Sequence, residues 1–223
     1  MMAGNENALI IFSRLPIGRE TKTRLSPLLN EEQREELHLA MWHDIFSEVL
    51  KLRRIDVFLY WTGSGDVKDY LKFIPSSFHL MKQSGVNLGE RMKNAAKDIM
   101  SLGYRRAVII GSDIPSMRAE NITRVFNALN ASDAVIGPSK DGGYWLIGMS
   151  RFIPDVFNIT SWGNSSVLNS TIEILKASGL TYEFVDTLND MDTPDDVMEF
   201  MKLTCNESSS TYKYLELAGN MPL

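Results

Sequence analysis

Two hydrophobic patterns alternate along the chain. Short runs of consecutive apolar residues, such as Ala8–Ser13 and Ala107–Ile110, are typical of strands buried on both faces of a parallel sheet. Between such runs, apolar residues recur every three or four positions, which indicates amphipathic helices. The clearest helical stretch is Leu37–Leu52, and Asn30 with Gln33 predicts a capping box in front of it.

Strands and helices are predicted in alternation over most of the sequence. The further predicted strands are Ile55–Trp61, Phe78–Met81, Ala134–Gly137, Tyr144–Gly148 and Tyr182–Val185, and the further helices are Leu88–Leu102, Ala119–Leu129, Val167–Ala177 and one after Pro194. This order predicts an α/β fold, a three-layer α/β/α sandwich around a mostly parallel central sheet. We expect one domain over residues 8–204, a disordered N-terminus at 1–7 and a loosely attached, serine-rich C-terminal tail at 205–223.

Composition and charge narrow the class of protein. Of the 223 residues, 44% are hydrophobic, as in an ordinary globular protein, and a net charge of −5 argues against non-specific nucleic-acid binding. The single cysteine, Cys205, excludes an internal disulfide and a cysteine zinc cluster. The chain shows no apolar run of about 18 residues and no signal-peptide pattern, so we expect a cytoplasmic protein. An exposed Trp42 on the first helix would suit a homodimer.

The loop after the first strand carries the strongest chemical signal. Residues 13–24 contain four cations and one carboxylate, at the sheet edge where α/β proteins bind ligands. Arg14 and Arg24 can each grip phosphate oxygens with two N–H groups, and Lys22 can place a point charge on a diphosphate. The glycine spacings of a P-loop and of a dinucleotide-binding fingerprint are both absent. The alternative is a solvated basic loop.

Asp113 is the first candidate for a metal ligand. It follows a buried strand directly, and a carboxylate on a rigid strand end is well placed to hold Mg²⁺ or Mn²⁺ against a diphosphate. Alternatively, Asp113 caps the helix that follows. The three histidines, His38, His43 and His79, form no metal or nucleophile constellation, and we interpret them as structural.

An ordered series of motifs makes the chain similar to a known family. The motifs are Phe12–Pro16, Lys22–Leu25, Asn87–Met92, Ile110–Pro115, Gly137–Pro138, Asp141–Gly148, Trp162–Gly163 and Asp190–Asp196. Over residues 8–203 the sequence resembles nucleotide-diphospho-sugar transferases, a family similar to GT-A-fold glycosyltransferases that includes arsenosugar biosynthesis enzymes. The sequence departs from the family at Arg14, where lysine is usual, and at Gly18–Arg19, where Pro-Gly is usual.

The resemblance implies roles for individual residues. It assigns the metal-binding acidic motif to Asp113, here one aspartate rather than an Asp-x-Asp pair, and makes Asp192 the second candidate ligand. An ordinary helix start at Thr193 is the competing interpretation of that segment. The predicted nucleotide-binding residues are Ser13, Arg14, Lys22, Thr23, Arg24, Gln83, Arg91 and Ser112, and the predicted catalytic residues are Lys22, Asp113 and Asp141.

An acceptor pocket is implied on the other side of the site. Its predicted residues are Gly142, Gly143, Tyr144 and Trp162. Asp141 would act there as a base or bind a sugar hydroxyl, and an aromatic ring could stack on a sugar or base. A routine Asp-Gly turn, and core packing of the tryptophan, are the alternatives.

Three functions fit these observations. The first is metal-dependent glycosyl transfer from a nucleotide diphosphate sugar to a small-molecule acceptor, with Mg²⁺ or Mn²⁺ and Lys22 neutralising the departing diphosphate. The second is nucleotidyl transfer, in which a phosphorylated acceptor attacks a nucleoside triphosphate and releases pyrophosphate. The third is a non-catalytic nucleotide-binding protein on the same scaffold.

Overall fold

The computed structural model describes residues 5–159, 162, 165–203 and 206–218. The strands are β1 (Asn7–Arg14), β2 (Ile55–Thr62), β3 (His79–Lys82), β4 (Arg106–Gly111), β5 (Ala134–Pro138), β6 (Tyr144–Met149) and β7 (Tyr182–Phe184). The α-helices are α1 (Glu31–Val49), α2 (Leu88–Ser101), α3 (Ala119–Ala128), α4 (Val167–Ala177), α5 (Pro194–Met201) and α6 (Ser210–Leu217), and 3₁₀ turns lie at Thr23–Leu25, Val67–Phe73 and Pro154–Phe157. Cys205, Gly163 and residues 1–4 of the predicted disordered N-terminus lie outside the described residues.

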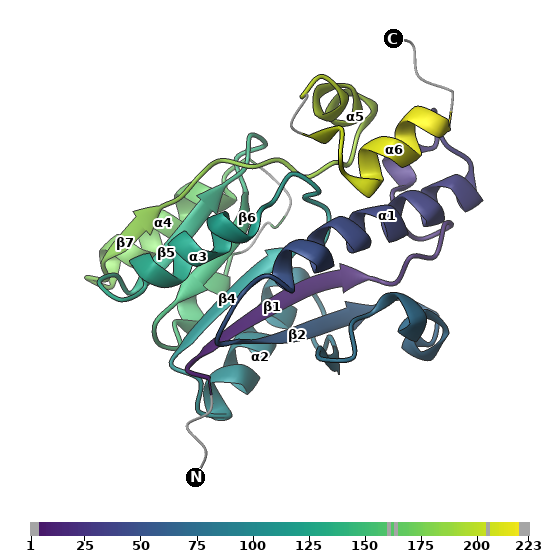
Figure 1. The fold of residues 1–223 in the computed structure, drawn as a ribbon. Coiled ribbons are helices and arrows are strands. Elements are labelled where there is room, and N and C mark those ends of the chain that lie inside the picture. The colour runs from purple at the N-terminus through teal and green to yellow at the C-terminus, as the bar shows by residue number, and fades with distance from the viewer. Residues whose placement is uncertain (1–4, 160–161, 163–164, 204–205, 219–223) are drawn as a thin grey trace.

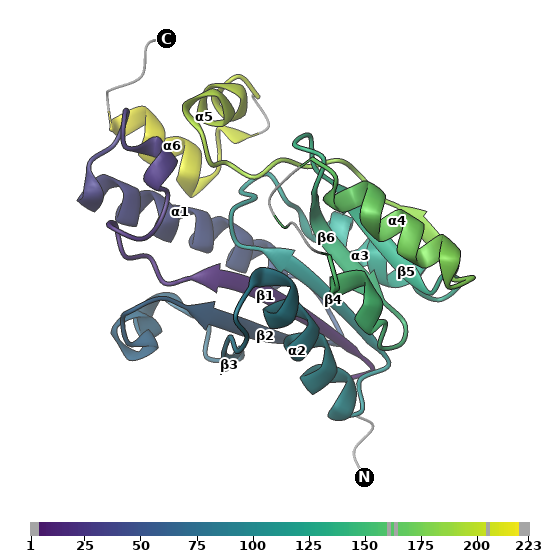
Figure 2. The ribbon, with the colours of Figure 1, turned by 180° about the vertical axis from the view of Figure 1, so that it is seen from behind.

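The strands form one seven-stranded sheet with the order β3-β2-β1-β4-β6-β5-β7. All neighbouring strands are parallel except β6, which runs antiparallel to both β4 and β5. Helices α1 and α3 cover one face of the sheet (Figure 1), and α2 and α4 cover the other (Figure 2). The three-layer α/β/α sandwich with a mostly parallel sheet is therefore confirmed.

The apolar runs form strands because both faces of the sheet are covered. In β1, Leu9 and Ile11 belong to the core under α1 and α3, whereas Ile10 and Phe12 belong to the core under α2 and α4. Successive side chains of a strand point to opposite faces, so burial on both sides requires an unbroken apolar sequence. These two cores hold the strands together as one sheet.

Helix α1 is buried on two sides, which corrects one expectation. Its inner side packs on the sheet, and its outer side packs against α5 and α6 through a third apolar cluster that includes Leu37 and Met41. Trp42, expected to be exposed and available to a dimer partner, is completely buried. The predicted reason for a homodimer therefore does not hold.

The C-terminal tail is more ordered than its serine-rich sequence indicates. Ser209 caps α6, and the carboxylate of Asp44 on α1 accepts hydrogen bonds from the amides of Ser210 and Thr211 at 2.7 and 2.8 Å. Figure 1 shows α6 lying along α1. The described part of the tail is therefore docked rather than loosely attached. Among the described residues, no helix is long and apolar enough to cross a membrane.

Candidate active site

A cavity of about 640 Å³ lies at the edge where β1, β3 and β4 end. Ligands bind at this edge in open α/β sheets, because the loops that leave parallel strands converge there. The cavity brings together most of the residues predicted from sequence. Those that line it are Ser13, Arg14, Lys22, Thr23, Arg24, Gln83, Arg91, Ser112, Asp113, Tyr144 and Asp192.

Lys22 stands at the centre of the charged groups. Its backbone is in the left-handed conformation, with φ 50°, and its side chain is only 2% exposed. The Nζ donates hydrogen bonds to the carbonyl of Met191 at 2.8 Å and to Oδ1 of Asp192 at 2.9 Å. Oδ1 of Asp113 lies 3.0 Å away on the same ammonium. The convergence of the first loop and the β4 tip, which the sequence predicts, is present.

The segment after β7 brings Asp192 to this place. It runs along the carboxyl edge of the sheet, where Val185 N bonds to Ile136 O at 3.0 Å and Met191 N bonds to Asp113 O at 2.9 Å. Helix α5 then begins with a capping box between Thr193 and Asp196. The ordinary helix start expected at Thr193 is therefore present, and Asp192, the residue before it, lines the cavity.

Lys22 and Asp113 each stabilise the charged form of the other. Burial would lower the pKa of Lys22, but the charges of Asp113 and Asp192 outweigh it and raise this pKa above its usual value. Burial would likewise raise the pKa of Asp113, but the charge of Lys22 holds it below its usual value. The Lys22 ammonium and the Asp113 carboxylate are therefore ionised together at neutral pH.

Asp190 is a third carboxyl group in the cavity wall, and we did not select it from the sequence. Burial, together with the charges of Asp113 and Asp192, raises the pKa of Asp190 to about 7. Its spacing of two from Asp192 is a signal that sequence analysis could have used. The shift itself depends on Asp113, which lies far away in the sequence, so no local pattern could reveal it.

A buried polar network supports the cavity floor. Ser13 Oγ lies 2.7 Å from Ser112 Oγ and accepts a hydrogen bond from Trp42 Nε1 at 2.8 Å. His38 joins Ser13 to Thr21, with its Nε2 3.3 Å from Ser13 Oγ and its Nδ1 bonded to Thr21 Oγ1. Burial lowers the pKa of His38 to about 4, so the ring is neutral and structural. The network ties β1, β4, α1 and the first loop together.

Three arginines face the cavity without a carboxylate partner among the described residues. Arg14 and Arg24 are exposed and form no ion pair there, and Arg91 donates only from Nε to the carbonyl of Gly85, at 3.1 Å. Arg91 lies in the first turn of α2, which Asn87 caps by accepting from Glu90 N at 2.9 Å. Unpaired guanidinium groups beside a helix N-terminus are suited to bind phosphate or carboxylate.

Gln83 occupies the tip of β3 and joins three strands. Its Nε2 donates to the carbonyl of Tyr60 at 2.9 Å and to that of Ser13 at 3.3 Å. Its amide nitrogen is thus used in the protein, and its carbonyl oxygen is the group that a nucleotide could contact.

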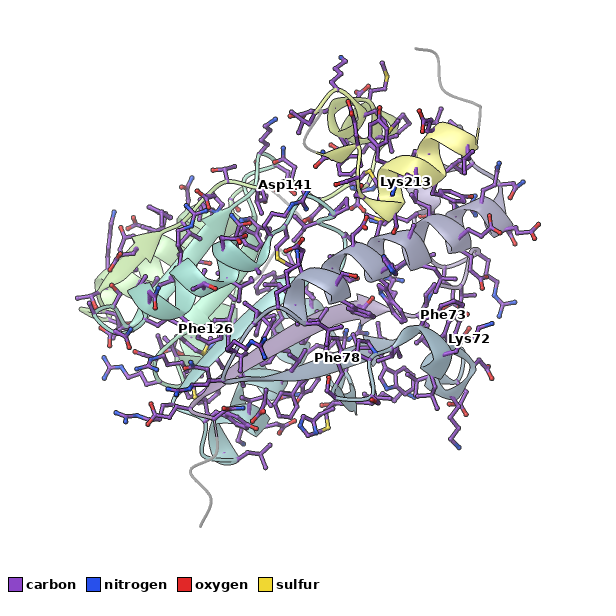
Figure 3. The ribbon with its side chains drawn as sticks, in the orientation of Figure 1. Lys72, Phe73, Phe78, Phe126, Asp141 and Lys213 are labelled. Atoms are coloured by element: carbon purple, nitrogen blue, oxygen red, sulfur yellow. The ribbon has the colours of Figure 1, made fainter. Side chains whose placement is uncertain are left out.

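The predicted acceptor residues only partly reach the cavity. Tyr144 lines it, but Asp141, Gly142, Gly143 and Trp162 are not among the lining residues. Asp141 lies in the turn between β5 and β6 (Figure 3), where its Oδ1 accepts from Ser139 Oγ at 2.5 Å and Gly143 N at 3.0 Å. Trp162 packs edge-on against Tyr144, with ring centroids 6.3 Å apart. Asp141 therefore stabilises a turn in this state.

Asp113 and Asp192 fit a divalent cation. Their Oδ1 atoms approach the same Nζ, so both carboxylates already converge on one cationic group. Oδ1 of Asp113 is buried, and although it is close to the ammonium it makes no hydrogen bond of acceptable angle. Among the described residues, no group of three or more His, Cys, Asp or Glu side chains could hold a metal. Mg²⁺ commonly uses one or two carboxylates and completes its shell with substrate phosphates and water.

Comparison with known proteins agrees with this geometry. A family model described as "Uncharacterized protein conserved in bacteria (DUF2064)" matches residues 45–164, which is more than half of the chain. The chain belongs to the DUF2064 family. This DUF2064 protein is also similar to the crystal structure of a "putative nucleotide-diphospho-sugar transferase" from Desulfovibrio desulfuricans G20, with 31% identity and a TM-score of 0.88. That match covers 96% of this chain and 95% of the other.

Two sequence relatives are named 2-phospho-L-lactate guanylyltransferase. The one from Methanocaldococcus vulcanius is 27% identical over 216 residues, covering 95% of this chain and 91% of that protein. The one from Methanobrevibacter smithii is 32% identical over 135 residues, and that match spans 60% of this chain and 58% of that protein. The resemblance drawn from the motifs is confirmed, and this DUF2064 protein is a transferase.

Proposed function

We propose that this protein is a nucleotidyltransferase, which transfers a nucleoside monophosphate from a nucleoside triphosphate to a phosphorylated small-molecule acceptor. The observation that carries the proposal is the convergence of Asp113 and Asp192 on Lys22 inside a cavity lined by three arginines that form no ion pair with any described residue. Two carboxylates beside cations suit a metal–triphosphate complex. The names of the sequence relatives support nucleotidyl transfer over glycosyl transfer, which we considered first from the sequence.

The reaction makes one phosphorus–oxygen bond and breaks another. An oxygen of the acceptor phosphate attacks the α-phosphorus, the bond from the α-phosphorus to the bridging oxygen breaks, and pyrophosphate leaves with that electron pair. Lys22, Arg14 and Arg24 bind the triphosphate and stabilise the charge that accumulates on the departing pyrophosphate. Asp113 and Asp192 would hold Mg²⁺ or Mn²⁺, which neutralises phosphate charge and aligns the reacting groups when bound.

This chemistry does not need a general base. A phosphate monoester has its second pKa near about 6 and is largely a dianion at neutral pH, so its oxygen is already a nucleophile. A sugar hydroxyl would instead require a base in the cavity. Asp141, the base suggested by the sequence, is held in a turn outside the lining residues. Asp141 therefore does not supply such a base, and a hydroxyl acceptor would have to use Asp190, the lining carboxyl group whose pKa is raised to about 7.

Product analysis distinguishes the two transfers. Purified protein with Mn²⁺ or Mg²⁺ is incubated with each nucleoside triphosphate and a panel of phosphorylated hydroxy acids, and pyrophosphate is measured with and without acceptor. We expect acceptor-dependent pyrophosphate release. Nucleotide sugars are tested in parallel for release of nucleoside diphosphate. Release of nucleoside diphosphate, with no pyrophosphate from any triphosphate, would contradict the proposal.

Matched aspartate variants test the site itself. Asp113→Asn and Asp192→Asn should each lower kcat/KM by about 100-fold or more. Each substitution removes a negative charge that would hold the metal against the phosphates. Asp195→Asn is the control. Asp195 is exposed on α5, close to Asp192 in the sequence, and its substitution makes the same change of charge and shape. Equal activity of all three variants would remove the two carboxylates from the mechanism.

A further inference from the structure

The ammonium of Lys22 is enclosed by acceptors of the protein. It donates hydrogen bonds to the Met191 carbonyl at 2.8 Å and to Asp192 Oδ1 at 2.9 Å, and Asp113 Oδ1 forms an ion pair with it at 3.0 Å. Its side chain is 2% exposed. A lysine that binds nucleotide phosphates must therefore first give up at least one of these oxygens.

The two carboxylates, by contrast, are open to the cavity. The side chain of Asp113 is 36% exposed, although its Oδ1 on the ammonium is buried, and that of Asp192 is 42% exposed, whereas the side chain of Lys22 is covered. A cation that enters from solvent reaches the carboxylates before it reaches Lys22. Two carboxylates and one ammonium leave a net negative charge, so the cluster still attracts a second cation.

We propose that Lys22 occupies the cation position in the ligand-free enzyme. Its ammonium neutralises Asp113 and Asp192 until a divalent cation takes over their oxygens. Repulsion between the two positive charges then turns the lysine away, and its N–H groups become available to phosphate oxygens. This exchange rests on the proposed function, because only a metal–phosphate reaction uses both states of the lysine.

The exchange makes the binding of metal and nucleotide interdependent. When metal binds alone, the displaced ammonium of Lys22 finds no phosphate partner. Metal alone therefore binds weakly. With nucleotide present, the displaced ammonium finds new acceptors, and the cost of breaking its ion pairs is offset. The lysine thus favours binding of the metal–nucleotide complex over binding of free metal.

Mn²⁺ titration without nucleotide tests the exchange. Binding is followed by the electron paramagnetic resonance signal of free Mn²⁺ for the wild type, Lys22→Met and the control Lys51→Met, in which an exposed lysine paired with Glu48 loses the same charge. We expect Lys22→Met to bind Mn²⁺ on the order of tenfold more tightly, because its competitor is gone. Lys51→Met should match the wild type. Equal or weaker Mn²⁺ binding by folded Lys22→Met would overturn the proposal.

A second measurement uses the wild-type protein, in case Lys22→Met does not fold. An amine-acetylating reagent is applied with and without saturating Mn²⁺, and labelling of each lysine is quantified by peptide mass spectrometry. Labelling of Lys22 should increase several-fold with Mn²⁺, while that of the exposed Lys68 stays constant. Unchanged or reduced labelling of Lys22 would refute the exchange. Both assays omit nucleotide, so their failure would leave nucleotidyl transfer standing, to be judged by pyrophosphate release.

Discussion

His38 should contribute a loss of stability at mildly acidic pH. The ring is 1% exposed and lies between Ser13, Thr21 and the edge of Trp42. Burial, with help from the charges of Lys22 and Arg14, lowers the pKa of His38 from 6.5 to about 4, although Asp113 acts in the opposite direction. The native state therefore excludes a proton that the unfolded chain accepts.

The sign and size of the effect follow from these two pKa values. Between pH 6.5 and 4 the unfolded state binds more protons than the native state, so the free energy of unfolding decreases as pH falls. The contribution is complete above 6.5 and is lost on the way down to 4. Lowering the pH from about 7.5 to about 5 should remove about 2 kcal/mol, and the full loss below pH 4 is about 3 kcal/mol.

Urea denaturation of the wild type and His38→Gln at pH 7.5 and pH 5, followed by tryptophan fluorescence, isolates this contribution, because the opposite effect of the raised pKa of Asp190 is common to both proteins. His38→Gln provides a side chain that can bond both hydroxyl groups but does not titrate, so its stability should fall by about 2 kcal/mol less than that of the wild type. His79→Gln, which removes an exposed histidine, should retain the wild-type loss. Parallel losses in the wild type and His38→Gln would refute the assignment of this pH dependence to His38.

Three substitutions test residues that hold the first loop and the cavity floor in place. Gly18→Ala should destabilise the protein by about 3 kcal/mol in thermal denaturation, because the added Cβ would overlap the backbone carbonyl of Glu31. Arg34→Met should cost about 3 kcal/mol in urea unfolding and weaken nucleotide binding in calorimetry, since the buried guanidinium donates three hydrogen bonds to the carbonyls of Gly18 and Leu29. Trp42→Phe should lower the free energy of unfolding by about 1 kcal/mol, because the hydrogen bond to Ser13 is lost. Urea unfolding of this variant is followed by circular dichroism, which does not depend on the removed tryptophan.

Much of the fold could be predicted because buried strands need unbroken apolar runs. The same logic predicted the meeting of Lys22 and Asp113, since loops after parallel strands share one edge of the sheet. The direction of β6 was not predictable in this way, because a short buried strand has the same apolar pattern whether it runs parallel or antiparallel. The hairpin of β5 and β6 nevertheless places Tyr144 at the cavity.

The error about Trp42 has its cause in distant segments. An amphipathic helix usually has one buried side, which predicts an exposed Trp42, whereas α1 is covered by the sheet on one side and by α5 and α6 on the other. The second cover of α1 leaves no trace in the local sequence. A role for Asp141 in the reaction stays a prediction, because its carboxylate is bonded within the Asp-Gly turn that the sequence offers as the alternative.

The contact between Lys22 and Asp192 joins positions 170 residues apart. A nascent chain grows from its N-terminus, so the lysine leaves the ribosome long before this aspartate does. During that interval the cations of the first loop are made, and Asp113 follows them after β4. The pair of carboxylates that would hold a metal is still incomplete. The proposed centre can therefore form only after Asp192 has been synthesised, by which time all the strands of the sheet have been made.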